Sequence, residues 1–315
     1  MECTAHGGTK PSANVKAMPL PRSSRTSKAR AEAGVQDLRL LSDDPEAQLL
    51  LATQLMRTSR HLDVVRTAIG IIGTARDPAH RAALYAKYGW CETKPAHNDT
   101  SGYIREAIVK ALQPIAQPGD LPLLQRALTT YQMDGAYEVC AGLRAAALIA
   151  TNDVDPGMAA LFAARFLTDP QNSFSGEPAT TAIRVLAAQQ NLAPIFGLVS
   201  WGKANGETIA EGLRNLVGIP ASLIPLLLGQ YRESEDEQVV LGLFDLLLGH
   251  PTRDEWVEEI MGFFRTTTLM DLYGIIAIQV VASRSGVLIE ALRELRATEF
   301  DPLRQGMLDQ ALGLA

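Results

Sequence analysis

The feature that most constrains the fold of this 315-residue chain is a short motif that recurs at a nearly fixed spacing. The pattern apolar-Arg-x-Ala occurs at 65–68, 104–107 and 143–146, and its arginines lie 39 residues apart. Two more apolar-Arg pairs follow, and acidic residues precede four of the arginines by six or seven positions. The series consists of Arg66, Asp99, Arg105, Glu138, Arg144, Glu177, Arg184, Glu207 and Arg214. Such a period indicates a tandem array of small structural units.

Hydrophobic periodicity indicates that each unit is a pair of helices. Apolar residues between 104 and 115 recur at the spacing of one helix face. The break Gln117-Pro118-Gly119-Asp120 ends this helix, and its aspartate can cap the next one. The pattern predicts an all-α chain of about eight antiparallel helix pairs. They run from 45–59 with 61–75 to 285–298 with 301–313, and one of them pairs 120–132 with 135–151.

The register resembles that of the HEAT repeat, an armadillo-like family in which an Asp precedes a Val-Arg-x-x-Ala run. The stretch Asp99…Ile104-Arg105…Ile108 matches, although the alanine stands two residues after the arginine instead of three. The resemblance is clear over residues 61–217 and fades beyond them. It implies an α-solenoid with a right-handed superhelix, in which the recurring acids and arginines form a structural ladder along the stacked repeats. The family includes HEAT-like repeats of the phycobilin-lyase type.

Charge divides the chain into two parts. Residues 1–34 contain six Lys or Arg and two Glu, so the remaining residues carry most of the acidity of a chain whose net charge is −6. We expect a disordered basic tail at 1–34 and a solenoid at 35–315. An acidic body disfavours nucleic-acid binding except through the tail. Three widely spaced cysteines, no secretory signal and no apolar span predict a cytoplasmic protein without membrane contact.

The loop at 90–102 departs most from the regular turns. Cys91, His97 and Asp99 lie in it, but no CxxC or HxxxH motif accompanies them, so we predict no metal site. No Gly-rich phosphate loop, GxSxG elbow or Cys-His pair is recognisable, and no catalytic residue or cofactor is predicted. The sequence leaves enzymatic activity open and favours a non-catalytic role.

A solenoid of stacked helix pairs offers an extended concave surface for a partner. The leading hypothesis is therefore a scaffold that binds another protein. The alternatives are a HEAT-like lyase or chaperone-type enzyme, and nucleic-acid binding through the tail. Candidate contacts come from the aromatic region beside the loop and from polar positions on the helix that begins near 103. They are Tyr85, Tyr88, Trp90, His97, Glu106, Lys110 and Gln113.

Overall fold

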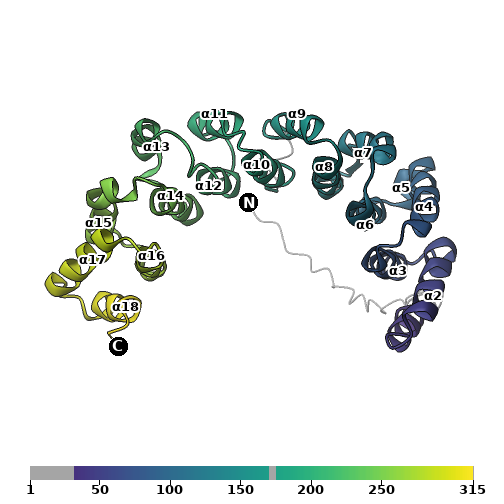
Figure 1. Ribbon diagram of the computed structural model, residues 1–315, viewed down its shortest axis with the longest axis horizontal. Helices are drawn as coiled ribbons and strands as arrows, with labels where there is room; N and C mark the ends of the chain where they lie inside the picture. The colour runs from purple at the N-terminus through teal and green to yellow at the C-terminus, as the bar shows by residue number, and fades with distance from the viewer. Residues whose placement is uncertain (1–31, 170–174, 315) are drawn as a thin grey trace, which may run out of the picture.

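The structure is a computed structural model and describes residues 32–169 and 175–314. The helices lie in two layers that form an arc (Figure 1). The outer layer contains α2 (Pro45–Thr58), α4 (Arg81–Thr93), α7 (Leu121–Leu128), α9 (Pro156–Phe166), α11 (Ala193–Trp201), α13 (Ile224–Tyr231), α15 (Val257–Thr266) and α17 (Gly286–Thr298). The inner layer contains α3 (Leu62–Ala75), α6 (Tyr103–Leu112), α8 (Ala141–Val154), α10 (Ala179–Ala188), α12 (Gly206–Arg214), α14 (Glu237–Gly249), α16 (Met270–Ala282) and α18 (Pro302–Leu312). The prediction of an all-α chain is confirmed.

Aspartates at helix starts explain why the helices begin where they do. Asp44, Asp155 and Asp301 each accept a hydrogen bond from a backbone N–H of the first turn, and each is followed by proline. Such side chains satisfy amide groups that have no partner within the helix, and proline has no amide hydrogen to leave unpaired. These local signals set the helix boundaries within a few residues of those expected from the sequence.

The predicted helix at 135–151 is wrong at its start. Residues Met133–Asp134 (β1) and Tyr137–Glu138 (β2) form a two-stranded antiparallel hairpin, and α8 begins only at Ala141. Met133 pairs with Glu138 and Asp134 with Tyr137. Gly135 lies in the turn and has a φ of 62°, a backbone conformation that glycine adopts without strain. The two-residue turn Gly135-Ala136 therefore forms a hairpin where a helix was expected.

Two other segments differ from the organisation expected from the sequence. The loop predicted at 90–102 begins later in the structure, because α4 extends to Thr93. The segment that follows contains a short helix, α5 (Pro95–Asn98), before the inner helix α6. Residues 32–40 are helical, so helical structure starts before the expected boundary at 35. The rest of the predicted tail, 1–31, lies outside the described residues.

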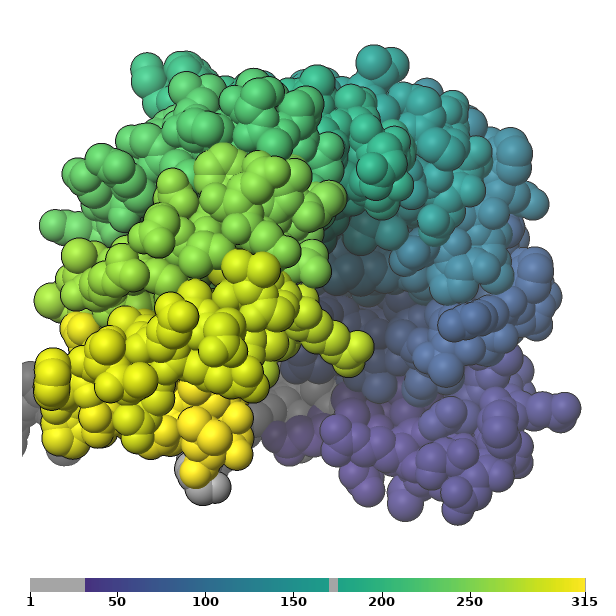
Figure 2. All heavy atoms as spheres, turned by 60° about the vertical axis from the view of Figure 1, so that its left-hand side comes forward, coloured from purple at the N-terminus to yellow at the C-terminus, as the bar shows by residue number. Residues whose placement is uncertain are grey.

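A single hydrophobic core runs along the arc between the two layers. The cluster of buried apolar side chains extends without interruption from Leu38 to Leu308. Because each helix pair has too little apolar surface to form a core alone, neighbouring pairs must stack to exclude water. The inner side of the arc is left as a hollow between the N-terminal and C-terminal helices, which Figure 2 shows from one side.

No helix within the described ranges is long and apolar enough to span a bilayer.

An ion pair joins the outer helices α4 and α7 across 39 residues of sequence. The Arg81 guanidinium donates to Asp120, whose carboxylate also accepts hydrogen bonds from Tyr85 Oη at 2.6 Å and from the Gln117 amide at 2.8 Å. Burial of the Asp120 carboxyl raises its pKa, but the hydrogen bonds from Arg81, Tyr85 and Gln117 outweigh that effect. The pKa of Asp120 therefore lies below its ordinary value.

We expect Asp120→Asn to lower the free energy of unfolding by about 1–3 kcal/mol near pH 7, because a charge-assisted hydrogen-bond network is lost. A carboxyl with a lowered pKa in the folded state contributes stability above its ordinary pKa and loses it as the pH falls through the folded value. The difference between wild type and variant should therefore shrink below about pH 4. Urea unfolding at several pH values measures the difference in free energy of unfolding between the two proteins. A difference that does not change with pH would contradict the stabilising role of the Asp120 carboxylate.

Candidate functional site

A groove between the neighbouring inner helices α3 and α6 is the candidate site on the concave side. Its volume is about 660 Å³. Gly70 and Gly73 on α3, with Ala107 and Ala111 on α6, give it a floor of small side chains. At Gly73 the helices approach so closely that an added Cβ would lie 2.9 Å from Ala111 Cα. At Gly70 a Cβ would meet no other part of the described chain within 4 Å, so the floor is open to a ligand there.

Cationic side chains surround this floor. Arg66, Arg76 and Lys110 line the groove together with one carboxylate, Asp63. Lys110 Nζ donates to Glu106 Oε1 at 2.6 Å along α6, which neutralises part of its charge. The remaining charges still leave the groove with an excess of positive charge, in a chain whose net charge is −6.

An exposed aromatic ring lies at one end of the groove. The Arg66 guanidinium carbon lies 5.1 Å from the centroid of the Tyr103 ring, and Tyr103 is exposed at the start of α6. This contact holds the arginine side chain against α6 without burying its charge. An exposed tyrosine beside a cation can contact both apolar and acidic groups of a partner.

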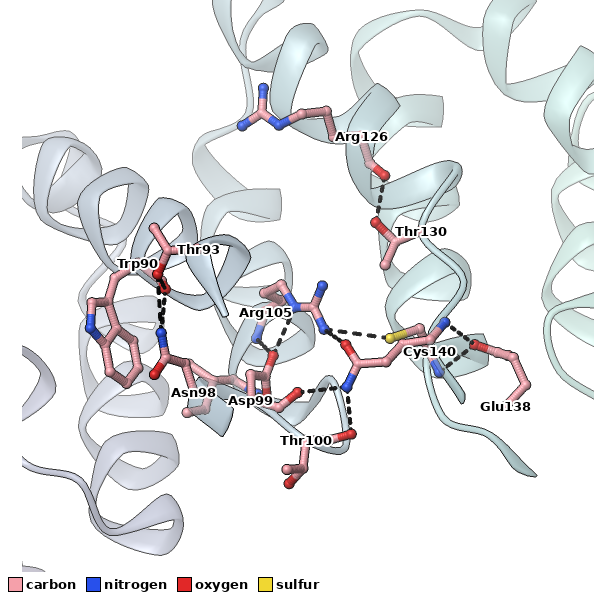
Figure 3. Close-up of polar contacts among 12 residues, drawn as sticks. Trp90, Thr93, Asn98, Asp99, Thr100, Arg105, Arg126, Thr130, Glu138 and Cys140 are labelled. Atoms are coloured by element: carbon pink, nitrogen blue, oxygen red, sulfur yellow. Dashed lines mark hydrogen bonds and ion pairs between the residues drawn. The ribbon is translucent and has the colours of Figure 1, made fainter. Parts of the chain in front are cut away.

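The arginines in the middle of the recurring series are structural. Asp99 Oδ2 accepts hydrogen bonds from Arg105 Nε at 2.9 Å and from the Arg105 amide, while Asp99 Oδ1 accepts from the Ile104 amide at the start of α6 (Figure 3). Arg105 Nη2 donates to Gln132, which in turn donates to the backbone oxygens of Asp99 and Thr100. The buried arginine thus joins α6 to the segment between α7 and β1.

Arg144 repeats this arrangement with more partners. Its Nη2 lies 2.9 Å from Glu138 Oε2 and 3.6 Å from Asp169 Oδ2. Its Nη1 donates to the Thr130 carbonyl at 3.0 Å, and its guanidinium carbon lies 4.0 Å from the Tyr131 ring centroid. The hairpin that interrupts the predicted helix places Glu138 against this arginine.

Later in the series the partners differ from those expected. Arg184 Nε donates to Glu211 at 2.7 Å, and Arg214 donates to both Glu211 and Asp245. Glu177 instead accepts hydrogen bonds from the amide and hydroxyl of Thr181, near the start of α10, and Glu207 is exposed. Glu211 lies one helical turn beyond Glu207 and faces the neighbouring helix, so it replaces both acids as the partner. Asp245 extends the chain of contacts to Gln279 on α16 at 2.9 Å.

Comparison with known proteins assigns no family. No family model, curated protein or solved structure matches this chain. The site must therefore be interpreted from its own residues.

The seven residues predicted to contact a partner do not form one surface. Glu106 and Lys110 lie on α6, and Gln113 follows its last residue and donates to Asp153 of α8 at 3.2 Å. Tyr85 and Trp90 lie on α4 in the outer layer, and His97 is exposed on α5. Tyr88 is fully buried and belongs to the core, so it cannot contact a partner. The aromatic region and the polar face of α6 therefore belong to different sides of the arc.

Several residues of this region were not predicted from the sequence. Asp63 and Arg76 line the groove and Tyr103 contacts Arg66, but none was a candidate contact, and Arg66 was expected in the ladder although it is exposed. Residues 63, 66, 70 and 73 follow the spacing of one helix face, and this pattern could have identified the α3 side of the groove. Which helix forms its other side depends on the packing of successive repeats.

Cys91 and Cys140 are buried free thiols. Burial raises the pKa of Cys91 to about 12 and that of Cys140 to about 11, because the thiolate would lose its hydration. Both therefore remain protonated at neutral pH and are poor nucleophiles. Within residues 32–169 and 175–314, no group of three or more His, Cys, Asp or Glu side chains is arranged to hold a metal ion.

Proposed function

We propose that this chain is a HEAT-like α-solenoid of about eight antiparallel helix pairs, and that it acts as a non-catalytic scaffold. The recurring Arg register and the two-layer arc support this classification. So do the ion pairs of Arg105 and Arg144, which occupy equivalent positions and join successive repeats. We place its binding activity on the concave side, where the inner helices present polar side chains around the hollow.

The partner that fits the α3–α6 groove best is an extended protein segment with acidic side chains. The observation that carries this proposal is the groove itself, with a floor of glycine and alanine and an excess of cations around it. Small residues let a partner backbone approach the helices closely, as they do where helices pack against each other. Arg66 and Arg76 can then pair with carboxylates on either side of the partner.

Gly70→Trp tests the proposal directly, because the new side chain would fill the groove without a clash at its Cβ. Peptides selected from a random library against the wild type should be enriched in Asp and Glu. Their affinity, measured by fluorescence anisotropy, should fall at least about tenfold in the variant, since the contact area is blocked.

Gly197→Trp is the matched control, because Gly197 lies exposed on α11 in the outer layer and a Cβ there also meets nothing within 4 Å in the described chain. It should bind the selected peptides like the wild type. A Lys110→Glu variant should weaken acidic peptides and leave neutral ones unaffected. Equal binding by the Gly70→Trp and Gly197→Trp variants would refute the assignment of the groove.

A further inference from the structure

A second cleft, which shares no lining residue with the α3–α6 groove, lies where the turn between α2 and α3 meets α4. Its volume is about 370 Å³. The C-terminal end of α2 contributes Arg57 and Thr58, the turn contributes Ser59 and Arg60, and α4 contributes Lys87 and Trp90, along with two alanines. Three of the lining side chains are cationic and none is acidic.

Lys87 is the most unusual residue of this cleft. Its side chain is buried, with a relative exposure of 7%, yet it forms no ion pair with any described carboxylate. Its Nζ lies 4.1 Å from the centroid of the Trp90 ring. Burial lowers the pKa of Lys87, and the more distant Cys91 and Asp99 oppose that shift only in part. A buried cation without an anionic partner is energetically costly, so an anion beside the Lys87 ammonium would be stabilising.

The two arginines are also without partners. Arg57 and Arg60 are exposed on the rim of the cleft, and neither forms an ion pair or a side-chain hydrogen bond with any described residue. Elsewhere in the chain, buried or half-buried arginines such as Arg105 and Arg144 lie against carboxylates. Three unpaired cations around one small cleft, in a chain with a net charge of −6, favour an anionic ligand.

We propose that this cleft binds a phosphate monoester, with the Lys87 ammonium at its base and the guanidinium groups of Arg57 and Arg60 at its rim. A phosphate monoester is close to doubly charged at neutral pH and has three acceptor oxygens, which suits three cationic donors. A carboxylate carries a single negative charge, so it would balance the three cations less well than a phosphate monoester. The Ser59 hydroxyl, which accepts a hydrogen bond from the His61 amide at 3.2 Å, lies in the same lining and can donate to a phosphate oxygen. The exposed part of Trp90 can contact the organic group of the ester.

The test is calorimetric titration of the full chain with O-phosphoserine near pH 7.5, at constant ionic strength. Trp90 fluorescence provides an independent signal, and a Trp90→Phe variant assigns that signal to the cleft. We expect saturable binding of O-phosphoserine, and no binding of serine or acetate under the same conditions. A second arm uses a neutral peptide with one phosphoserine. Tighter binding of the peptide would assign the ligand to a phosphorylated protein, and equal binding would assign it to a small molecule.

Lys87→Met keeps the buried stem of the side chain and removes its charge, so we expect affinity to fall at least about tenfold. Because a buried substitution can disturb folding, the exposed double variant Arg57→Gln/Arg60→Gln provides a second test and should show a similar loss. The matched control is Lys203→Met, since Lys203 lies over the exposed Trp201 ring at 5.0 Å outside the cleft. Binding that is unchanged in both cleft variants, or a response to acetate equal to that of O-phosphoserine, would overturn the proposal.

Discussion

Replacing Arg144 with methionine is expected to lower the free energy of unfolding by about 3–5 kcal/mol. The Arg144 side chain has a relative exposure of 0%, and its two carboxylate partners, Glu138 and Asp169, are exposed by 2% and 1%. Methionine fills much of the volume but leaves both carboxylates without their cation. The cost arises from these uncompensated buried charges and exceeds the loss of one ordinary hydrogen bond.

Arg184→Met is the matched control, because Arg184 occupies the next place in the same recurring series. Its side chain is 60% exposed, and its partner Glu211 keeps a second contact with Arg214 at 3.1 Å. We expect a loss below about 1 kcal/mol, as for other exposed ion pairs. Urea unfolding followed by circular dichroism compares the two variants. Equal losses would show that the arginines of the series do not differ in their contribution to stability.

Replacing Gly242 with alanine is expected to destabilise the protein by about 1–3 kcal/mol. Gly242 lies on α14 where this helix packs against α12, and an added Cβ would lie 2.7 Å from both Ala210 Cα and Ala210 O. These are backbone atoms, so the two helices themselves would have to separate. The substitution should also expose the inner layer at this point to faster amide hydrogen exchange.

Gly262→Ala on α15 should have the opposite sign. A Cβ there meets nothing within 4 Å in the described chain, and alanine lowers the conformational entropy of the unfolded state. We expect a gain of about 0.5–1 kcal/mol. Thermal unfolding of the Gly242→Ala and Gly262→Ala variants compares the cost of a packing clash with the effect of replacing glycine by alanine in a helix. A stabilised Gly242→Ala variant would contradict the close approach of α12 and α14.

Local signals in the sequence account for much of the secondary structure. The apolar period between 104 and 115 predicted the helix that becomes α6, and the break at 117–120 predicted that a new helix begins near 120, where α7 starts. The main error lies at 135–140, where Gly135 belongs to the turn of a hairpin and not to the start of a helix. Gly242 and Gly274 occupy similar places within inner helices. Of these two, Gly242 is the one at which an added Cβ would clash with the backbone of a neighbouring helix.

The sequence by itself determined that the chain is helical, where most helices begin and end, and that its arginines recur at a nearly fixed spacing. These properties depend on residues within one helix or one turn, whose interactions follow from spacing along the chain. Only the tertiary structure decided that Tyr88 belongs to the core, that Glu211 replaces Glu177 and Glu207 as the partner of two arginines, and that Lys87 is buried without an anion. Which side chains are buried, and which form ion pairs between neighbouring helix pairs, depends on how successive helices are rotated against each other. Side-chain packing along the whole arc sets that rotation.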